Sequence, residues 1–346
     1  MIASIDRKSV AGWCIYDLAN SPFPAIVLTF VIPAYFVEAV MGNAAQATTW
    51  WAIMTGTAAF AITVLSPILG AIADQGRGRK IWLAVFTTII ALGSACLWFV
   101  LPAAGYAILL LILVGVSVVA FELSMVFYNA LLPGLVPRAW VGRVSGWAWG
   151  LGYFGGVGGL LIVLFGFVLA DPPPFGMDAG DGALEHVRIA GPIVALWLLM
   201  FCLPLFVWTH DSRGRGLSPC PAVRAGLAEL RMTLMTLRTH PQLWRFLLAR
   251  MIFTDGLNTL FVFGGVFGAG TFGMPVAEVI MFGLVLNVTA GVGAFAFGWV
   301  DDWLGAKQTI LLGLCGLVLL GLPLLLIESK LVFVILGAGL GVFFGP

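Results

Sequence analysis

Charged residues are scarce in this chain. Only 10% of its 346 residues are Asp, Glu, Lys or Arg, and 61% are hydrophobic, whereas a soluble domain usually carries about 25% charged residues. So little polar side-chain surface cannot cover so much apolar chain, which excludes a soluble enzyme. The net charge of +1 argues against a nucleic-acid partner. The composition indicates a polytopic membrane protein.

The residues that build metal, redox or hydrolytic sites are also few. The three histidines, His186, His210 and His240, lie outside the apolar runs, and the five cysteines are far apart with no C-x-x-C pair. We therefore expect no metal site, disulfide framework or cofactor. No G-x-x-x-x-G-K-[ST] loop is present for an ATP-driven pump, and no H-E-x-x-H for a metalloprotease.

Long apolar runs dominate what remains. A helix needs about 20 apolar residues to cross a hydrocarbon core of about 30 Å. Nine runs satisfy this, at 11–37, 50–73, 81–101, 104–132, 145–170, 189–209, 243–268, 277–300 and 308–327. A tenth starts near Leu331 and reaches the last residue, Pro346. We predict an all-α polytopic membrane protein, and we expect the chain to be a fragment that stops inside its tenth helix.

The basic residues predict the orientation of these spans. Lysines and arginines gather before the first span and in alternate loops, at 7–8, 77–80, 138–143 and 213–238. The opposite loops hold almost none, only Arg188 and Lys330. Because basic loops stay on the cytoplasmic side, we expect a cytoplasmic N-terminus.

One long polar stretch, residues 210–242, divides six spans from the rest. Its second half has leucines and methionines at helical spacing with arginines between them, which is typical of an amphipathic helix on the inner leaflet. An ordinary linker helix is the simpler interpretation. We predict an N-terminal six-helix bundle over 1–209, a cytoplasmic linker over 210–242 and an incomplete C-terminal bundle of about four helices over 243–346.

Two short patterns recur on either side of this linker. The first is D-x-x-N, as Asp17 and Asn20 in span one and as Asp255 and Asn258 in span seven. The second is a glycine–acid–base loop, which comprises Gly70, Asp74, Arg77, Arg79 and Lys80 after span two and Gly298, Asp302, Gly305 and Lys307 after span eight. Two halves in the same orientation are a known transporter plan, with the substrate site between them near the midplane.

These loops resemble the signature loop of the major facilitator superfamily, G-x-x-x-D-x-x-G-[RK]-[RK]. The copy at 70–80 has one extra residue, and the copy at 298–307 has one basic residue. The stretches WCIYDLANS at 13–21, FYNALLP at 127–133 and GRVSGWAWGLG at 142–152 resemble the vacuole-effluxer-like branch. The resemblance implies a two-bundle fold of twelve spans, of which this chain has about ten, and a cavity lined by spans one, four, seven and ten. It also implies amino-acid export for fungal relatives, and gating for the two loops.

Three acids lie well inside the predicted spans, away from their ends. At 1.5 Å per residue, Asp17, Glu122 and Asp255 lie about 9, 15 and 18 Å from the cytoplasmic ends of their spans. A charge at the bilayer centre costs at least about 2.5–3.5 kcal/mol, so such acids are functional candidates. We predict a substrate and coupling site of Asp17, Asn20, Glu122, Tyr128, Asn129, Asp255 and Asn258. The alternative is that the acids tie helices together, for instance Asp255 with Arg250.

Together these patterns predict a secondary active transporter, not an enzyme, that moves a small solute by alternating access. Three acids without a clearly buried base favour a substrate with an amine, or co-movement of protons or sodium. Amino-acid efflux is the activity that the resemblance implies. We expect a monomer in a bacterial inner membrane rather than a vacuole. The gating loops could instead bind anionic lipid headgroups, and the alternatives to transport are an intramembrane enzyme and a receptor or scaffold.

Overall fold

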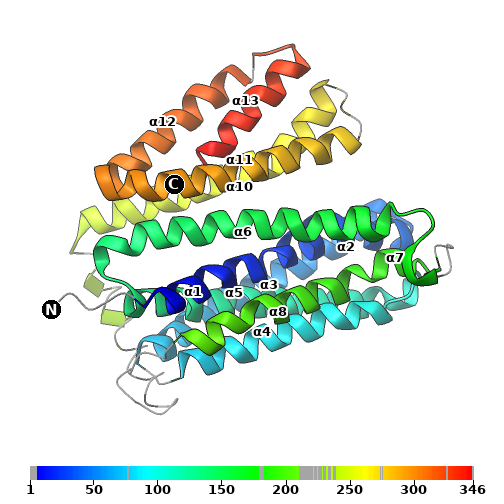
Figure 1. Cartoon of the computed structure of the whole chain (residues 1–346), viewed down its shortest axis with the longest axis horizontal. Helices are drawn as coiled ribbons and strands as arrows, with labels where there is room; N and C mark the ends of the chain where they lie inside the picture. The colour runs from blue at the N-terminus through cyan, green and yellow to red at the C-terminus, as the bar shows by residue number, and fades with distance from the viewer. Residues whose placement is uncertain are drawn as a thin grey trace. The chain divides into compact units, whose positions relative to one another are not determined.

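A computed structural model describes residues 6–344 apart from 76–77, 179–182, 210–220, 273, 275, 325 and several short gaps in 222–238. The described elements are helices (Figure 1). They include α1 (Arg7–Asn20), α3 (Ala44–Gln75), α4 (Arg79–Cys96), α5 (Ala107–Leu135), α6 (Val141–Val163), α8 (Ala190–Trp208), α10 (Pro241–Phe272), α11 (Val276–Leu304), α12 (Ala306–Leu324) and α13 (Lys330–Val342). The short helix α7 (Glu185–Arg188) precedes α8.

Within the described residues, eight helical segments are long and apolar enough to cross a membrane. They coincide with the first six predicted spans and with the eighth and ninth. The seventh apolar run lies in α10, and the tenth forms the 13-residue helix α13. The predicted all-α, multi-pass membrane fold is confirmed.

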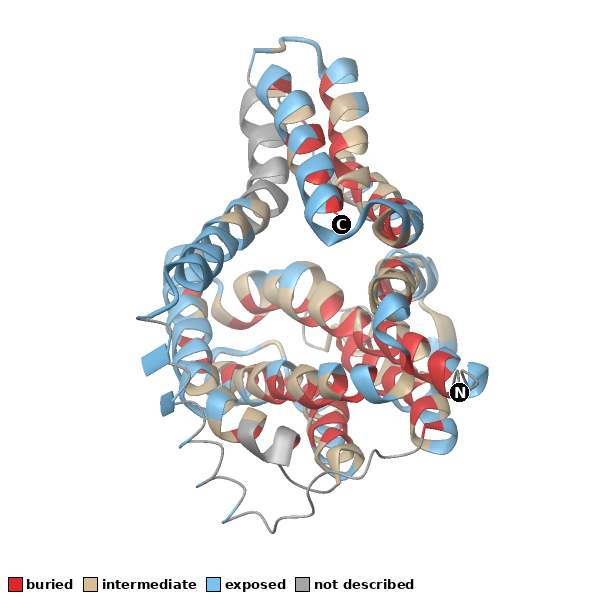
Figure 2. Cartoon of the chain, turned by 90° about the vertical axis from the view of Figure 1, so that its left-hand side faces the viewer, coloured by how far each residue is buried: buried red, intermediate tan, exposed pale blue. Residues whose placement is uncertain are grey.

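The outer surfaces of the helices are apolar. Phe60 is 73% exposed, Leu196 68% and Leu319 71%, and Figure 2 shows buried residues along the faces where helices meet. A water-soluble protein rarely exposes so much contiguous apolar surface. In a lipid bilayer the hydrocarbon chains solvate this apolar surface, and each helix makes the hydrogen bonds of its own backbone N–H and C=O groups.

The chain divides into two compact units. The N-unit comprises Met1–Pro137 and Gly155–Leu227, and the C-unit comprises Arg138–Phe154 and Ala228–Pro346. The chain therefore changes unit three times: just before α6, inside α6 and inside the polar stretch between α8 and α10. The boundaries proposed from sequence, 209 and 243, stay a prediction.

In the N-unit, α1 packs along α8, α4 packs against α5 and α8, and α3 packs on α5. Small residues permit the closest approach of α1 to α8: a Cβ atom on Gly12 would lie 2.8 Å from the Pro204 carbonyl oxygen. The same pair is joined by Trp197, whose indole Nε1 donates to the Leu18 carbonyl at 2.9 Å. These contacts hold α1 close to α8.

Prolines interrupt the regular hydrogen bonding of span one. Beyond α1 the chain continues as the π-helical segment η1 (Phe23–Phe30), the short helix α2 (Val31–Tyr35) and a second π-helical segment η2 (Phe36–Met41). The wider i→i+5 pattern and side-chain bonds, such as Thr29 Oγ1 to the Pro24 carbonyl at 3.0 Å, supply partners for the backbone near the prolines. The span therefore stays helical through its prolines.

In the C-unit, α13 packs tightly along α11. Gly337 and Gly341 form a G-x-x-x-G pair, and a Cβ atom on Gly341 would lie 2.7 Å from the Leu286 carbonyl oxygen. Small residues of this kind let membrane helices approach closely. An ion pair between Lys330 and Glu278 joins the N-terminal ends of the two helices, so the pair is tied at one end and closely packed along its length.

Candidate functional site

The candidate site is centred on Asp17 in α1. The helix starts at Asp6, whose carboxylate accepts the Lys8 amide at 3.1 Å as an N-cap, and Asp17 lies in its last turns. Asp17 is 7% exposed and Asn20 is 3% exposed. Both side chains are therefore buried within the N-unit, on the face that the i, i+3 spacing predicts.

One face of α5 packs against this part of α1. Phe121, Met125 and Tyr128 share it at spacings of three and four residues. Phe121 stacks on Phe23 with ring centroids 5.5 Å apart, and Asn20 Nδ2 donates to Met125 Sδ at 3.4 Å. The contact between α1 and α5 therefore surrounds Asn20 with side chains of α5.

Trp13 and Tyr128 tie the two helices reciprocally. Trp13 Nε1 donates to the Tyr128 backbone carbonyl at 3.0 Å, and the Tyr128 hydroxyl donates to the Trp13 carbonyl at 3.1 Å. Their rings are stacked with centroids 4.4 Å apart and planes 3° apart. The Asp17 carboxylate also interacts with the side chains of Tyr128 and Asn20. The Tyr128 hydroxyl therefore donates to the Trp13 carbonyl and lies beside the Asp17 carboxylate.

A second tyrosine extends the polar cluster to α4. The Tyr16 hydroxyl lies 2.8 Å from Thr87 Oγ1 and also interacts with the Ser124 side chain of α5. Thr87 in turn donates to the Leu83 carbonyl at 2.7 Å. Three helices, α1, α4 and α5, are thus joined by buried hydroxyl groups beside Asp17. We call Trp13, Tyr16, Asp17, Asn20, Thr87, Ser124 and Tyr128 the Asp17 cluster.

The polar partners of Asp17 are neutral. In the part of the chain that the structure describes, the ion pairs are Arg143–Asp302 and Lys330–Glu278, and no basic nitrogen lies within 4.0 Å of the Asp17 carboxylate. Nor do the described residues include a group of three or more His, Cys, Asp or Glu that could hold a metal. The cluster offers one carboxyl group surrounded by hydroxyl, amide and aromatic groups.

The other predicted site residues lie elsewhere. Glu122 and Asn129 are exposed on α5, seven residues apart and therefore on one helix face, outside the Asp17 cluster. Asp255 is exposed on α10, and the Asn258 side chain lies outside the described residues. The structure thus brings Asp17, Asn20 and Tyr128 together, and the remaining assignments stay predictions.

Sequence reasoning missed Trp13, Tyr16, Thr87 and Ser124. Trp13 and Tyr16 precede Asp17 by four residues and by one, and this spacing in the sequence indicates a polar and aromatic face on span one. All three residues are buried in the structure. Nothing in the sequence identifies the partners of this face on α4 and α5.

In the first gating loop, basic side chains bind helix carbonyls. Arg79 donates from Nε to the Ala73 carbonyl of α3 at 2.5 Å and from Nη1 to the Ala130 carbonyl of α5 at 2.9 Å. Lys80 Nζ donates to the carbonyls of Phe206, at 2.8 Å, and Thr209 at the end of α8. These are C-terminal ends of helices, where free carbonyls and the helix dipole favour cations. Gly70 lies in the described part of α3, whereas Arg77 and the Asp74 side chain lie outside the description.

In the second gating loop, the acid pairs with a base from another helix. Asp302, near the end of α11, forms an ion pair with Arg143 of α6. Gly298 lies where the two helices approach closely, since its Cβ would be 3.3 Å from the Arg143 carbonyl oxygen. Gly305 has φ of +78° and follows the last residue of α11, the usual position for a left-handed glycine. Lys307 is exposed.

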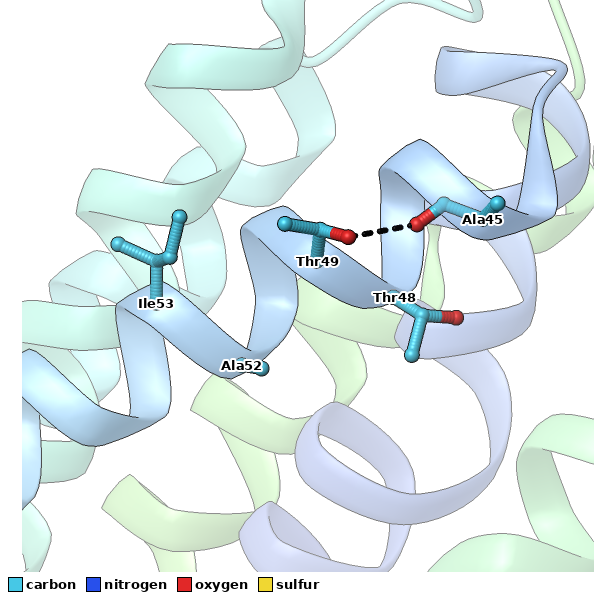
Figure 3. Close-up of a pocket in the computed structure, with 5 residues that line it drawn as sticks. All are labelled: Ala45, Thr48, Thr49, Ala52 and Ile53. Atoms are coloured by element: carbon cyan, nitrogen blue, oxygen red, sulfur yellow. Dashed lines mark hydrogen bonds between the residues drawn. The ribbon is translucent and has the colours of Figure 1, made fainter.

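Two hollows on the surface contain none of the predicted site residues. One, of about 800 Å³, is lined by Ala45, Thr48, Thr49, Ala52 and Ile53 on α3 alone, and its Thr49 hydroxyl is already bonded to the Ala45 carbonyl (Figure 3). The other, of about 580 Å³, is lined by apolar side chains of α6 and α11. A hollow lined by one helix or by hydrocarbon side chains alone lacks the convergent polar groups of a solute site.

Comparison with known proteins identifies the family. Residues 36–324 match the family model described as "Vacuole effluxer Atg22 like". An uncharacterized MFS-type transporter of Bacillus subtilis (strain 168), YxiO, is 26% identical over 310 residues, which are 89% of this chain and 71% of that protein.

Solved structures show the same fold. The proton:xylose symporter XylE, bound to 6-bromo-6-deoxy-D-glucose, matches with a TM-score of 0.69 and 15% identity, over 99% of this chain and 78% of that one. The human organic anion transporter MFSD10 matches with a TM-score of 0.62 and 13% identity, over 98% and 84%. The chain belongs to the Atg22-like vacuole effluxer family and is a multi-pass membrane transporter of the major facilitator type.

Proposed function

We propose that this transporter is a secondary active transporter of a small solute and that Asp17 is its coupling group. The observation that carries the proposal is the burial of the Asp17 carboxyl among neutral donors, without a basic partner in the described residues. A charged acid at the bilayer centre costs at least about 2.5–3.5 kcal/mol. Binding of a proton, a sodium ion or a substrate ammonium removes or balances that charge.

The neutral surroundings favour reversible binding. An acid held by a fixed arginine already has its counter-ion, so a proton or cation would have to displace it. Tyr128 and Asn20 instead offer hydrogen-bond donors that the carboxylate can keep or release. Asp17 can therefore exchange a proton or a cation with less rearrangement of its neighbours than a buried ion pair requires.

For the substrate we propose an amine-bearing solute, with amino acids as the first class to test. The family description names an effluxer, and the acids of the predicted site, Asp17, Glu122 and Asp255, would attract an ammonium group. The basic loops support a cytoplasmic N-terminus. The membrane we propose is a bacterial inner membrane, and the substrate would be carried across it by alternating access.

For gating we propose the two glycine–acid–base loops. In the first, Arg79 and Lys80 hold the C-terminal ends of α3, α5 and α8. In the second, Asp302 holds α11 to the beginning of α6 through Arg143. Contacts that hold helix ends together can favour one state of the transporter if they break in the other. Asp74 and Arg77 are included in this proposal only because of their positions in the sequence pattern of the loop.

Transport by reconstituted protein tests the proposal. Proteoliposomes with an internal pH dye would receive pools of amino acids, peptides or organic cations under an imposed proton gradient, with and without sodium. We expect a pool-dependent pH change that Asp17→Asn abolishes. Glu38→Gln is the matched control, because Glu38 is an exposed carboxyl in η2 of the same span. Equal transport by wild-type and Asp17→Asn protein at every pH and sodium concentration would refute the role of Asp17.

A further inference from the structure

The Tyr128 hydroxyl is the one group of the Asp17 cluster that contacts both the acid and the backbone of α1. It donates to the Trp13 carbonyl at 3.1 Å and interacts with the Asp17 side chain. Tyr128 is 1% exposed, so no solute reaches the hydroxyl without a rearrangement. A phenol has one proton to donate; in this structure the Trp13 carbonyl accepts it, and the Asp17 carboxylate is the alternative acceptor.

We propose that Tyr128 acts as a hydrogen-bond switch, which passes the protonation state of Asp17 to the contact between α1 and α5. This inference rests on the proposed role of Asp17 and adds a route by which that role would move helices. Tyr128 is a positioning residue in this scheme, since it acts through Asp17 and Trp13.

The two states differ in where the phenol proton goes. When Asp17 is ionised, its carboxylate is the stronger acceptor, because hydrogen bonds to charged groups are roughly twice as strong as neutral ones. Tyr128 then donates to Asp17, and the Trp13 carbonyl loses a donor. When Asp17 binds a proton, its O–H can donate to the phenol oxygen, and the phenol proton returns to the Trp13 carbonyl. No bond is made or broken beyond the transfer of that one proton to Asp17.

The geometry explains why this change would affect helix packing. Trp13 lies four residues before Asp17, so by helix geometry its carbonyl is the acceptor of the Asp17 amide. Tyr128 therefore acts on the same turn of α1 that carries the acid. The other half of the tie, from Trp13 Nε1 to the Tyr128 carbonyl at 3.0 Å, does not depend on the phenol proton. It keeps the two helices in contact while the first half changes.

The titratable side chains around Asp17 decide whether a pH-dependent change at Trp13 can be attributed to Asp17. The titratable side chains that interact with Asp17 are Cys14, Tyr16 and Tyr128. Cys202 of α8 lies on the side of Tyr16, and α4 faces the cluster with the hydroxyl of Thr87. A pH-dependent change at Trp13 that follows the Asp17 carboxyl band would therefore report Asp17.

Fluorine NMR of the full chain labelled with 5-fluorotryptophan tests the switch. The Trp13 resonance is assigned by its loss in Trp13→Phe, and the protonated-carboxyl infrared band of Asp17 is followed in parallel and assigned by Asp17→Asn. We expect the Trp13 resonance and the infrared band to titrate together. Tyr128→Phe, which keeps the stacked ring, should abolish the Trp13 shift while the Asp17 band still titrates. Tyr35→Phe is the control, because the Tyr35 hydroxyl donates to the Val100 carbonyl outside the Asp17 cluster, and it should retain both.

Two outcomes would overturn the inference. A Trp13 shift that persists unchanged in Tyr128→Phe would show that the phenol proton is not the route. A wild-type Trp13 resonance that ignores pH while the Asp17 band titrates would reject the switch and leave the role of Asp17 intact. If Tyr128→Phe does not fold, the wild-type tyrosine hydroxyl band decides, because it must change at the Asp17 midpoint. Absence of any Asp17 titration would remove proton coupling itself.

Discussion

The ion pair between Arg143 and Asp302 should contribute measurably to the stability of the C-unit. Their side chains are 24% and 12% exposed, between a surface pair and a buried one. Exposed pairs contribute about 0.2–1 kcal/mol, and breaking a buried pair costs about 3–5 kcal/mol. We therefore expect a coupling free energy of about 1–2 kcal/mol between the two side chains.

The two single substitutions should differ in size. Arg143→Gln removes the ion pair and also the contact of its guanidinium with the Trp140 ring, 4.7 Å away, which is worth about 0.5–1 kcal/mol at exposed sites. It also leaves Asp302 beside the like-charged Asp301. Asp302→Asn leaves Arg143 on Trp140 and relieves that repulsion. Arg143→Gln should therefore be the more destabilising substitution.

The assay is a double-mutant cycle by denaturant titration in lipid–detergent micelles, with Arg138→Gln as the control. Arg138 is an exposed arginine five residues away, and its loss should change the free energy of unfolding by less than about 0.5 kcal/mol. Additive effects of Arg143→Gln and Asp302→Asn, within about 0.3–0.5 kcal/mol, would refute the reasoning, as would Asp302→Asn proving the more harmful of the two.

Three further substitutions test other contacts. Lys80→Met should lower the thermal stability of the N-unit, because the free energy of a charge-assisted hydrogen bond is about 1.5–3 kcal/mol; unchanged melting would contradict this cap on α8. Tyr16→Phe should cost about 0.5–1.5 kcal/mol of unfolding free energy, since it removes the hydrogen bond between the Tyr16 hydroxyl and Thr87 Oγ1; an equal or higher stability would argue against the bond. Gly341→Leu should cost about 1–3 kcal/mol through overpacking against the Leu286 carbonyl, measured as earlier proteolysis of the C-terminal helices; wild-type resistance would show that α13 can move away.

The spans could be predicted from the sequence because hydrocarbon imposes a length and a composition on every crossing helix. Eight of the predicted runs recur as membrane-spanning helices in the described residues. The burial of Asp17 was also predictable, because a charged group in an apolar run is costly and must face protein or a polar cavity. Both inferences depend on local sequence alone.

The partners of these residues could not be predicted, because they depend on which helices meet and in what register. Lys80 was identifiable as a basic residue of a loop, but its acceptors are carbonyls of α8, 126 and 129 residues further along the chain. Tyr128 is 115 residues from Trp13. A backbone carbonyl also has no residue signature, so reciprocal ties of this kind leave no pattern in a single sequence.

The distribution of charge in the N-unit supports the assignment of Asp17. The basic side chains Arg79 and Lys80 are used up by carbonyls at helix ends, and Arg188 is likewise bound to the carbonyls of Trp98 and Ala183. These groups stabilise the frame, but none of them neutralises the buried acid. Under the proposed coupling role, and with no basic partner for Asp17 among the described residues, its counter-charge would arrive as a proton, an inorganic cation or part of a solute. If Asp17-dependent transport varies with pH at a fixed sodium concentration, the coupling ion is the proton. If it varies with sodium concentration at a fixed pH, the coupling ion is sodium.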